Sequence, residues 1–311
     1  MKNSQGRYFR YSSFLKSRFH SPVRKISVDA GFSCPNREGS FSIQGCIYCN
    51  NDAFSPARQV SGQTVQQQVL QAIEHRSRAE RPEKYIVYFQ PFTNTYAPVK
   101  QLEVLYREAF CHPDVVGIAI GTRPDCLDSE KAELIGRLAE KSYVSLEIGV
   151  QSIYDDTLRR INRGHDFKAV EQAMALFVGS RVEIGFHLIL GFPWEKKETA
   201  SESGRILAGL NYHSIKIHHL HVCRNTPLER EYLQAKLSLP SMESHVVSVV
   251  DFLENTPGSI VVQRLMGDVP KEYLVAPAWS GNKAGVLSAI DAEFAKRNSF
   301  QGKHTSCPYG R

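Results

Sequence analysis

The chain has 311 residues, of which 42% are hydrophobic and 23% charged, and a net charge of +6. This is the composition of a globular protein that is large enough for one core with a smaller appendage. No apolar run approaches the ~20 residues that a membrane-spanning helix needs, and the N-terminus has no apolar segment of the kind that directs secretion. The composition therefore excludes a membrane-spanning protein and predicts a cytoplasmic one.

The chain begins with a basic, aromatic arm, residues 1–25. The first 28 residues contain no acidic side chain, and their basic residues are Lys2, Arg7, Arg10, Lys16, Arg18, Arg24 and Lys25. Aromatic residues interleave with them: Tyr8, Phe9, Tyr11, Phe14 and Phe19. Charge and base stacking together hold polyanions, so the arm predicts contact with nucleic acid. The alternative is a solvated arm whose aromatic side chains pack on the domain.

Short apolar, β-branched runs alternate with helical patterns along most of the chain. The runs that predict strands are residues 26–30, 85–90, 115–121, 143–150, 182–190 and 214–222. The segments that predict helices are residues 64–78, 99–110, 129–141, 167–178, 197–210 and 227–235. Six strand–helix units in one direction imply a parallel sheet, because each crossover helix returns the chain to the same edge.

The predicted fold class is α/β, with a partial (β/α)6 TIM-type barrel over residues 26–236. Strand runs that are apolar almost throughout suit a sheet buried on both faces. A doubly wound open sheet is the alternative, because periodicity does not distinguish the two. After residue 236 the alternation stops, and residues 237–311 predict a C-terminal α+β extension with helices at 242–255 and 283–298 and a strand at 259–265. At about 75 residues it would be a marginal independent folder, so we expect it to dock on the barrel.

Three cysteines form one group directly after the first predicted strand. Cys46 and Cys49 are separated by two residues, so both thiolates reach one metal centre from a single turn, and an eleven-residue loop brings Cys34 back to them. No fourth cysteine or suitably spaced histidine lies nearby in the sequence. A cluster held by three cysteines leaves one iron open for a small molecule, and loops after barrel strands are where such folds build active sites. The group predicts a [4Fe–4S] cluster with Cys34, Cys46 and Cys49 as its ligands.

Zinc is the alternative metal at this point. A structural zinc site normally has four protein ligands, so a distant residue would complete it: Cys223, His221 or Cys307. The cysteines outside the group stand singly, and we expect Cys111, Cys126 and Cys223 to be small buried hydrophobic residues. Spacing alone therefore leaves two classes open, an iron–sulfur enzyme and a zinc-containing nucleic-acid-binding protein without catalysis.

The cysteine loop and its surroundings resemble the radical S-adenosylmethionine superfamily. The usual spacing there is three residues and then two, whereas eleven and then two resembles the branch that contains the catalytic subunit of Elongator. Five blocks in order resemble its YhcC-like family: SVDAGFSCPNREG, YFQPFTNTYAPV, GTRPDCL, LEIGVQSIYDDTLRRINRGHD and HLILGFPWE. The resemblance covers nearly the whole chain. It implies S-adenosylmethionine as a second cofactor, and its reductive cleavage to a 5′-deoxyadenosyl radical.

The resemblance also implies contacts with that cofactor. Tyr48 would lie near the adenine, and Gly191 would let the backbone approach the same ring. Residues 90–96 stand where relatives carry a glycine-rich stretch that meets the methionyl amino group. Their polar candidates are Gln90, Thr93 and Asn94.

Two further positions match cofactor-binding patterns in related enzymes. Glu147 and Gln151 fit the Glu-x-Gly-x-Gln pattern of the Elongator-like branch, and strand alternation puts them on one face with Gly149. Buried there they would need polar partners, which cofactor hydroxyls and amines would supply; a structural polar pair joining strands is the alternative. Arg163 matches an arginine that approaches the cofactor carboxylate, which its guanidinium fork suits.

Other polar residues have less definite predictions. Arg123 would face either the substrate or a neighbouring carboxylate, and a lone strand histidine such as His187 is typical of a satisfied core residue. Alternation sends His219 and His221 to one face, where we expect a polar wall of the substrate site rather than a metal pair. A Gly/Pro-rich loop of the extension would cover the site with Arg264, Asp268, Trp279 and Lys283.

The substrate is the least specified part of the function. No second cysteine group is present, which argues against methylthiolation, and the length leaves no room for an added acetyltransferase domain. The basic arm and the Elongator-like resemblance predict a tRNA base as substrate. An electron donor such as flavodoxin or ferredoxin is the implied partner, and no residue is assigned a catalytic role.

Overall fold

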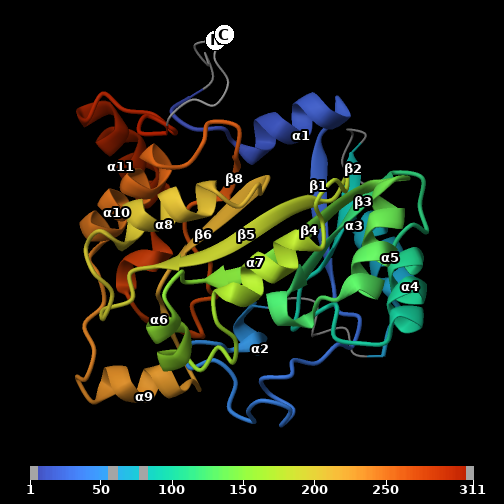
Figure 1. The fold of residues 1–311 in the computed structure, drawn as a ribbon, viewed down its shortest axis with the longest axis horizontal. Coiled ribbons are helices and arrows are strands. Elements are labelled where there is room, and N and C mark those ends of the chain that lie inside the picture. The colour runs from blue at the N-terminus through green and yellow to red at the C-terminus, as the bar shows by residue number, and fades with distance from the viewer. Residues whose placement is uncertain (1–5, 55–61, 77–82, 306–311) are drawn as a thin grey trace.

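Seven parallel strands form a curled half-barrel in the computed structural model, which describes residues 6–54, 62–76 and 83–305 (Figure 1). In spatial order they are β1 (Val23–Val28), β2 (Lys84–Phe89), β3 (Val115–Thr122), β4 (Tyr143–Gln151), β5 (Glu183–Leu190), β6 (Ser214–His219) and β8 (Val261–Arg264). The order never reverses, whereas a doubly wound sheet reverses at its switch point. The predicted partial barrel is therefore confirmed, and the open sheet is excluded.

Helices follow most of the strands and share one apolar core with the sheet (Figure 1). They are α3 (Val65–Arg76), α4 (Val99–Glu108), α5 (Ser129–Ala139), α7 (Lys168–Ala175), α8 (Thr199–Ala208) and α10 (Met242–Glu254). Polar side chains cap the N-termini of several of these helices. At the N-terminus of α5, for example, Asp128 Oδ1 accepts the N–H of Lys131 at 2.9 Å.

Shorter elements and the last helix complete the described chain. They are α1 (Tyr11–Phe19), α2 (Asn51–Phe54), η2 (Pro124–Cys126), α6 (Asp155–Arg160), β7 (Val222–Cys223), α9 (Pro227–Leu233), β9 (Leu274–Ala276), η3 (Ala278–Gly281) and α11 (Lys283–Lys296). The sixth strand is shorter than predicted, because the sheet ends at His219 and the next strand, β7, pairs antiparallel with β9. The sequence does not show where the strand ends, because Leu220 and Val222 beyond His219 are also apolar and buried.

Residues after 236 join the barrel through a strand and a helix. Strand β8 pairs in parallel with β6, so this part of the chain supplies the seventh strand of the sheet. Helix α10 packs on α8, where a Cβ at Gly204 would come within 2.6 Å of the Phe252 carbonyl oxygen. The two helices therefore approach more closely than any residue with a side chain allows at this position.

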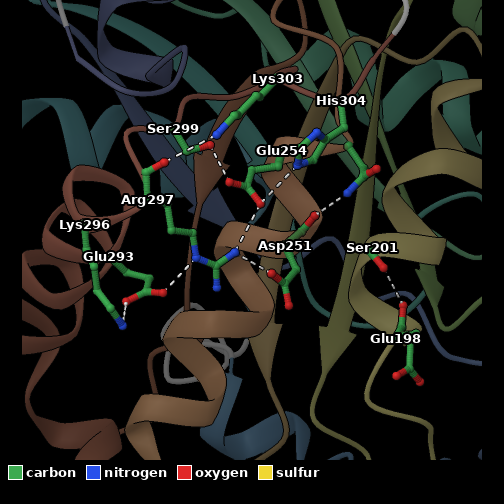
Figure 2. Close-up of polar contacts among 11 residues, drawn as sticks. Glu198, Ser201, Asp251, Glu254, Glu293, Lys296, Arg297, Ser299, Lys303 and His304 are labelled. Atoms are coloured by element: carbon green, nitrogen blue, oxygen red, sulfur yellow. Dashed lines mark hydrogen bonds and ion pairs between the residues drawn. The ribbon is translucent and has the colours of Figure 1, made fainter.

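Charged side chains hold α11 on α10 (Figure 2). Arg297, directly after α11, donates hydrogen bonds to Asp251 at 2.6 Å and to Glu254 at 3.1 Å. Its Nε also donates to Glu293 at 2.7 Å, and Ser299 hydrogen-bonds Glu254 from the following turn. Because the Arg297 guanidinium binds three carboxylates, the segment directly after α11 has a defined position on α10 and α11.

The N-terminal arm packs on the barrel through its aromatic side chains. Phe14 and Phe19 contact Tyr143, the first residue of β4, with ring centroids 6.4 and 5.5 Å away. Tyr8 stacks on Phe294 of α11 at 6.4 Å. These contacts match the alternative of an arm whose aromatic side chains pack on the domain, and base stacking by the arm stays a prediction. The arm's exposed residues include basic ones: Arg10, Lys16, Arg18 and Arg24.

Among the residues that the structure describes, no helix is both long enough and apolar enough to cross a membrane.

Replacing Leu15 by alanine should lower the free energy of unfolding by about 2–4 kcal/mol. Leu15 is 7% exposed and packs with Ile86 and Tyr88 inside the barrel, so the truncation leaves a cavity at the point where α1 closes it. Urea denaturation followed by circular dichroism measures the change. Lys16→Ala, exposed on the same helix, is the control and should stay within about 0.5 kcal/mol of the wild type. An unchanged value for Leu15→Ala would mean that α1 is not part of the folded core.

Candidate active site

One cavity of about 740 Å³ runs from the carboxyl ends of the strands into the barrel. It is lined by the cysteine loop and by strands on both sides of the barrel, and most of the predicted site residues meet there. These are Cys34, Cys46, Tyr48, Cys49, Gln90, Thr93, Glu147, Gln151 and Arg163. Gly149 lines the cavity as well, so the predicted shared face of Glu147, Gly149 and Gln151 is confirmed.

The segment after β4 holds the cysteine loop in place. Asn162 Nδ2 donates to the carbonyl of Gly45 at 2.7 Å, and its own carbonyl accepts from Asn36 Nδ2 at 2.5 Å. The same Asn36 amide lies 3.4 Å from Cys46 Sγ. Within the loop, the Cys49 N–H donates to the Cys46 carbonyl at 3.0 Å, which places the two thiols on one turn. The loop is therefore positioned by backbone and amide contacts that leave its three sulfurs facing the cavity.

Arg163 lies against one of these sulfurs. Its Nη2 donates to the carbonyl of Gly149 at 2.8 Å, and its Nη1 lies 3.9 Å from Cys46 Sγ. A Cβ at Gly149 would come within 2.7 Å of the guanidinium and 2.6 Å of the Gln151 amide, so a side chain there would displace the ends of Arg163 and Gln151. A buried guanidinium beside a sulfur stabilises negative charge on it, as in a thiolate that binds metal.

The donor set fits a [4Fe–4S] cluster with a small polar ligand beside it. Thiols are soft ligands that suit iron–sulfur clusters. Three buried nitrogens at the cavity, Arg123 Nη1, Arg163 Nε and His218 Nε2, have no hydrogen-bond partner in the described chain. Carboxylate and hydroxyl groups of a bound cofactor would satisfy them.

Glu147 lies deeper in the barrel and is surrounded by cationic side chains. Its carboxylate accepts from Lys25 Nζ at 2.6 Å, contacts Lys216 Nζ, and lies 3.0 Å from His187 Nε2. Burial raises the pKa of Glu147, but the two ammonium groups outweigh burial and hold that pKa well below its usual range. Burial lowers the pKa of Lys216 to about 7, against the opposing effect of the carboxylate. These contacts match the alternative prediction, a polar group that joins strands.

Sequence reasoning missed the two lysines. Lys25 was assigned to the arm because the first strand was predicted to begin at residue 26, whereas β1 begins at Val23. Lys216 sits in the buried strand β6, two residues before His218, and both line the cavity. A charged residue within an otherwise apolar strand is the signal that would have found it, since buried lysines need partners.

Two predicted cofactor residues do not line the cavity. Asn94 is fully buried behind it, and its Nδ2 donates to the carbonyls of Gly121 at 2.9 Å and Pro91 at 3.0 Å. Gly191 has a positive φ of 93°, and a Cβ there would lie 2.7 Å from Pro240 Cγ. Asn94 thus connects the loop after β2 to β3, and Gly191 packs against the segment before α10.

The structure also shows where the residues with less definite predictions lie. Arg123 pairs with Asp125 through two hydrogen bonds of 2.9 and 2.8 Å, so it faces a neighbouring carboxylate, and it also lines the cavity. Arg264 and Asp268 of the extension line the cavity as expected. Trp279 does not, because its ring lies 4.5 Å from that of His219.

The predicted histidine wall of the substrate site is wrong. His219 Nε2 lies 2.6 Å from Ser280 Oγ, and its ring lies 5.3 Å from that of His221 and 5.5 Å from that of His245 on α10. Both predicted residues therefore point toward the extension, and the histidine of this segment that lines the cavity is His218. The reason is alternation itself, because the cavity face of β6 carries Lys216 and His218, and His219 takes the opposite face.

A parallel half-barrel with a three-cysteine loop and a polar cavity at the carboxyl ends of its strands is the architecture of an enzyme that cleaves S-adenosylmethionine. Residues 39–204, more than half of the chain, match the Radical SAM superfamily, and residues 212–296 match the Radical_SAM C-terminal domain. The chain therefore belongs to the radical SAM superfamily. It is a radical S-adenosylmethionine enzyme whose cofactors are a [4Fe–4S] cluster and S-adenosylmethionine, and the alternative of a zinc protein without catalysis is wrong.

The similarity to two bacterial proteins extends over nearly the whole chain. "Uncharacterized protein YtqA" of Bacillus subtilis is 35% identical over 97% of this chain and 94% of its own length. "Protein YhcC" of Escherichia coli is 29% identical over 95% of this chain and 94% of its own. The predicted YhcC-like relationship is thus confirmed.

Elongator-related proteins are similar over part of their length. A tRNA uridine(34) acetyltransferase of Methanocaldococcus infernus is 26% identical over 62% of this chain and 35% of its own length. The solved structure of the Methanocaldococcus infernus Elp3 with an N-terminal deletion has a TM-score of 0.69 at 16% identity. It covers 90% of this chain, which spans 64% of that longer one, and at this identity the likeness shows a shared fold.

Replacing Glu147 by glutamine should lower the free energy of unfolding by about 3–5 kcal/mol, because the buried Lys216 must then lose its proton or keep a charge without its partner. Chemical denaturation measures the loss. Glu133→Gln, which breaks an exposed pair with Arg137, is the control and should have little effect. Adding Lys216→Met to Glu147→Gln should recover part of the loss, and additive effects of the two substitutions would contradict the coupling.

Buried histidines should make the stability fall in mild acid. Burial lowers the pKa of His187, His221 and His245 to about 4, whereas histidines of the unfolded chain bind protons near 6.5. The unfolded state therefore holds more protons below pH 6.5, so stability is complete above that pH and is lost as the pH falls toward 4. Each histidine contributes about 1.4 kcal/mol per pH unit in this window.

Denaturation between pH 7.5 and pH 5 measures this dependence. His245→Gln should reduce the slope by about one proton. A slope that His245→Gln does not change would contradict the assignment.

Proposed function

We propose that Cys34, Cys46 and Cys49 hold the [4Fe–4S] cluster of this enzyme, and that the radical made there acts on a tRNA base in the cytoplasm. One observation carries the first part. The three cysteines come from one loop and line the same cavity as the polar residues at the strand ends, with Arg163 against Cys46. The open side of a three-cysteine cluster would then face the interior of the barrel.

When bound, the reduced cluster supplies an electron to S-adenosylmethionine, which yields methionine and a 5′-deoxyadenosyl radical. Arg163 compensates negative charge at Cys46, and its Nε remains available for the methionyl carboxylate. Gln90 and Thr93 after β2 take the methionyl amino group, and Tyr48 takes the adenine. Gln151, held beside Arg163 by Gly149, takes a ribose hydroxyl.

Other residues shape and enclose the site. Asn94 and Gly191 act from behind it, by holding the loop after β2 and the turn after β5. Residues 268–270 of the extension line the cavity, and Lys283 donates to Asp268 at 2.6 Å. This loop would restrict the entry of water and oxygen to a reaction that tolerates neither. The electron comes from a small reduced protein of the flavodoxin or ferredoxin type.

The tRNA substrate has separate support. A relative of this chain is a tRNA uridine(34) acetyltransferase, with which it shares 26% identity over 62% of this chain. The arm keeps basic side chains exposed although its rings are packed. Comparing the modified nucleosides of tRNA from cells with and without the gene tests this proposal. One missing nucleoside supports it, and identical profiles would move the substrate to small metabolites.

Replacing Cys34, Cys46 or Cys49 by alanine should abolish both the brown colour and the formation of 5′-deoxyadenosine. The wild type, purified without oxygen, should contain about four irons per chain and cleave S-adenosylmethionine under reduction. Cys111→Ala is the matched control and should keep both properties, since Cys111 is a single cysteine on the helix side of the sheet. A colourless protein with stoichiometric zinc, or a loss of iron in the control alone, would contradict the ligand assignment.

A further inference from the structure

The half-barrel has an open seam between its two edge strands. In the described chain β1 pairs with β2, β8 pairs with β6 and forms one isolated bridge with Arg10 of the arm, and no ladder joins β1 to β8. Side chains close the seam instead, because Lys25 Nζ donates to Gln263 Oε1 at 3.0 Å. The arm lies alongside, where the Phe9 carbonyl accepts the N–H of Val262 at 2.8 Å. Side chains move more easily than a sheet, so this seam is a place where a ligand can enter.

A second hollow lies on the outer side of this seam. This side cleft, of about 1070 Å³, is bounded by α1, β1, β8 and α11. Four residues line both the side cleft and the active-site cavity: Tyr11, Lys25, Gln263 and Arg264. The two spaces therefore adjoin at the seam, and the Lys25–Gln263 contact stands between them.

The lining of the side cleft is mostly basic. Its charged residues are six basic ones, Arg10, Lys16, Arg24, Lys25, Arg264 and Lys283, and one acidic one, Glu83. Ion pairs offset part of this charge, because Arg24 pairs with Glu83 at 2.6 Å, Arg10 with Asp291 at 3.4 Å and Lys283 with Asp268 at 2.6 Å, while Lys16 is exposed on α1. Basic side chains along a groove that leads to a cavity match a chain of phosphates whose attached groups turn inward.

We propose that the side cleft binds the sugar–phosphate chain of an RNA substrate, and that its target base reaches the cavity across the Lys25–Gln263 seam. The proposal rests on the tRNA substrate of the proposed function. An enzyme that acts on a base must take it out of its stack, and the phosphates then stay outside while the base enters. The side cleft and the cavity provide these two places, on either side of one hydrogen bond. An acidic peptide offers charge but no flat group for the cavity.

Binding of tRNA from cells that lack the gene tests the proposal. The probe is this tRNA, and the protein is the anaerobic holoenzyme with S-adenosylmethionine. Lys16→Gln with Arg24→Gln should weaken binding roughly tenfold near 0.1 M salt and reduce the slope of log K against log salt by about 1.4 to 1.8, because two phosphate contacts are lost. Lys168→Gln with Arg205→Gln, exposed on α7 and α8, removes the same charge elsewhere and should change the affinity less than twofold.

Each other outcome counts against the side cleft. Equal affinities of the cleft variant and the wild type would overturn the proposal, as would an equal loss in the control pair, which would mean binding by overall charge. Polyglutamate that displaces tRNA at matched charge concentration would indicate an acidic peptide instead. Cleavage of S-adenosylmethionine by the wild type without tRNA reports on the cluster proposal separately, and nucleoside profiles of the deletion strain report on the tRNA substrate.

A photo-crosslinking residue at Ser12, which is exposed and lines the side cleft, provides a test that does not depend on charge. It should form a crosslink to one region of the tRNA, and the same group at Lys168 should not. Crosslinking of equal yield at both positions, or none at Ser12, would overturn the proposal.

Discussion

The polar interior of this barrel depends on one buried carboxylate. Glu147 accepts from Lys25 on β1 and Lys216 on β6, and lies beside His187 on β5. Each of these groups would be costly to bury alone, and together they connect strands from opposite sides of a sheet that does not close. A closed barrel would hold its shape through backbone pairing all the way round. Here the ion pairs of Glu147 hold the strands together in part, and they leave the interior open for ligands.

The cysteine loop is held by a different device. Its ends are fixed by the turn after β1 and by the segment after β4, which meets the loop through Asn36, Asn162 and the Gly45 carbonyl. Arg163 follows Asn162 directly, so the residues that hold the loop also place a positive charge at Cys46. One segment therefore determines both the position of the loop and the electrostatics at its sulfur. That coupling explains why a segment after β4 is needed for a site whose three cysteines all come from the loop after β1.

The extension belongs to the site as much as to the fold. It adds β8 to the sheet, and with it Gln263 and Arg264 to the cavity. Helix α11 and the arm pack against each other through Phe294 and Tyr8, so both ends of the described chain meet at the seam. The arm's rings contribute to this packing, while Arg10, Lys16, Arg18 and Arg24 are exposed.

The sequence by itself determined the strand–helix order, the metal ligands proposed in one loop, and the family, because each of these is written in residues that are close together or periodic. Nine of the predicted site residues line one cavity, because parallel strands bring their carboxyl ends together at one edge of the sheet. Only the tertiary structure decided the partners of Glu147, the place of Gly191 against Pro240, and the facing of His219 toward Trp279. These contacts join segments far apart in the chain, and side-chain alternation does not say which neighbour lies opposite. The seam between β1 and β8 could not be predicted for the same reason. Whether the two edge strands of a sheet pair with each other depends on the whole sheet and not on either strand.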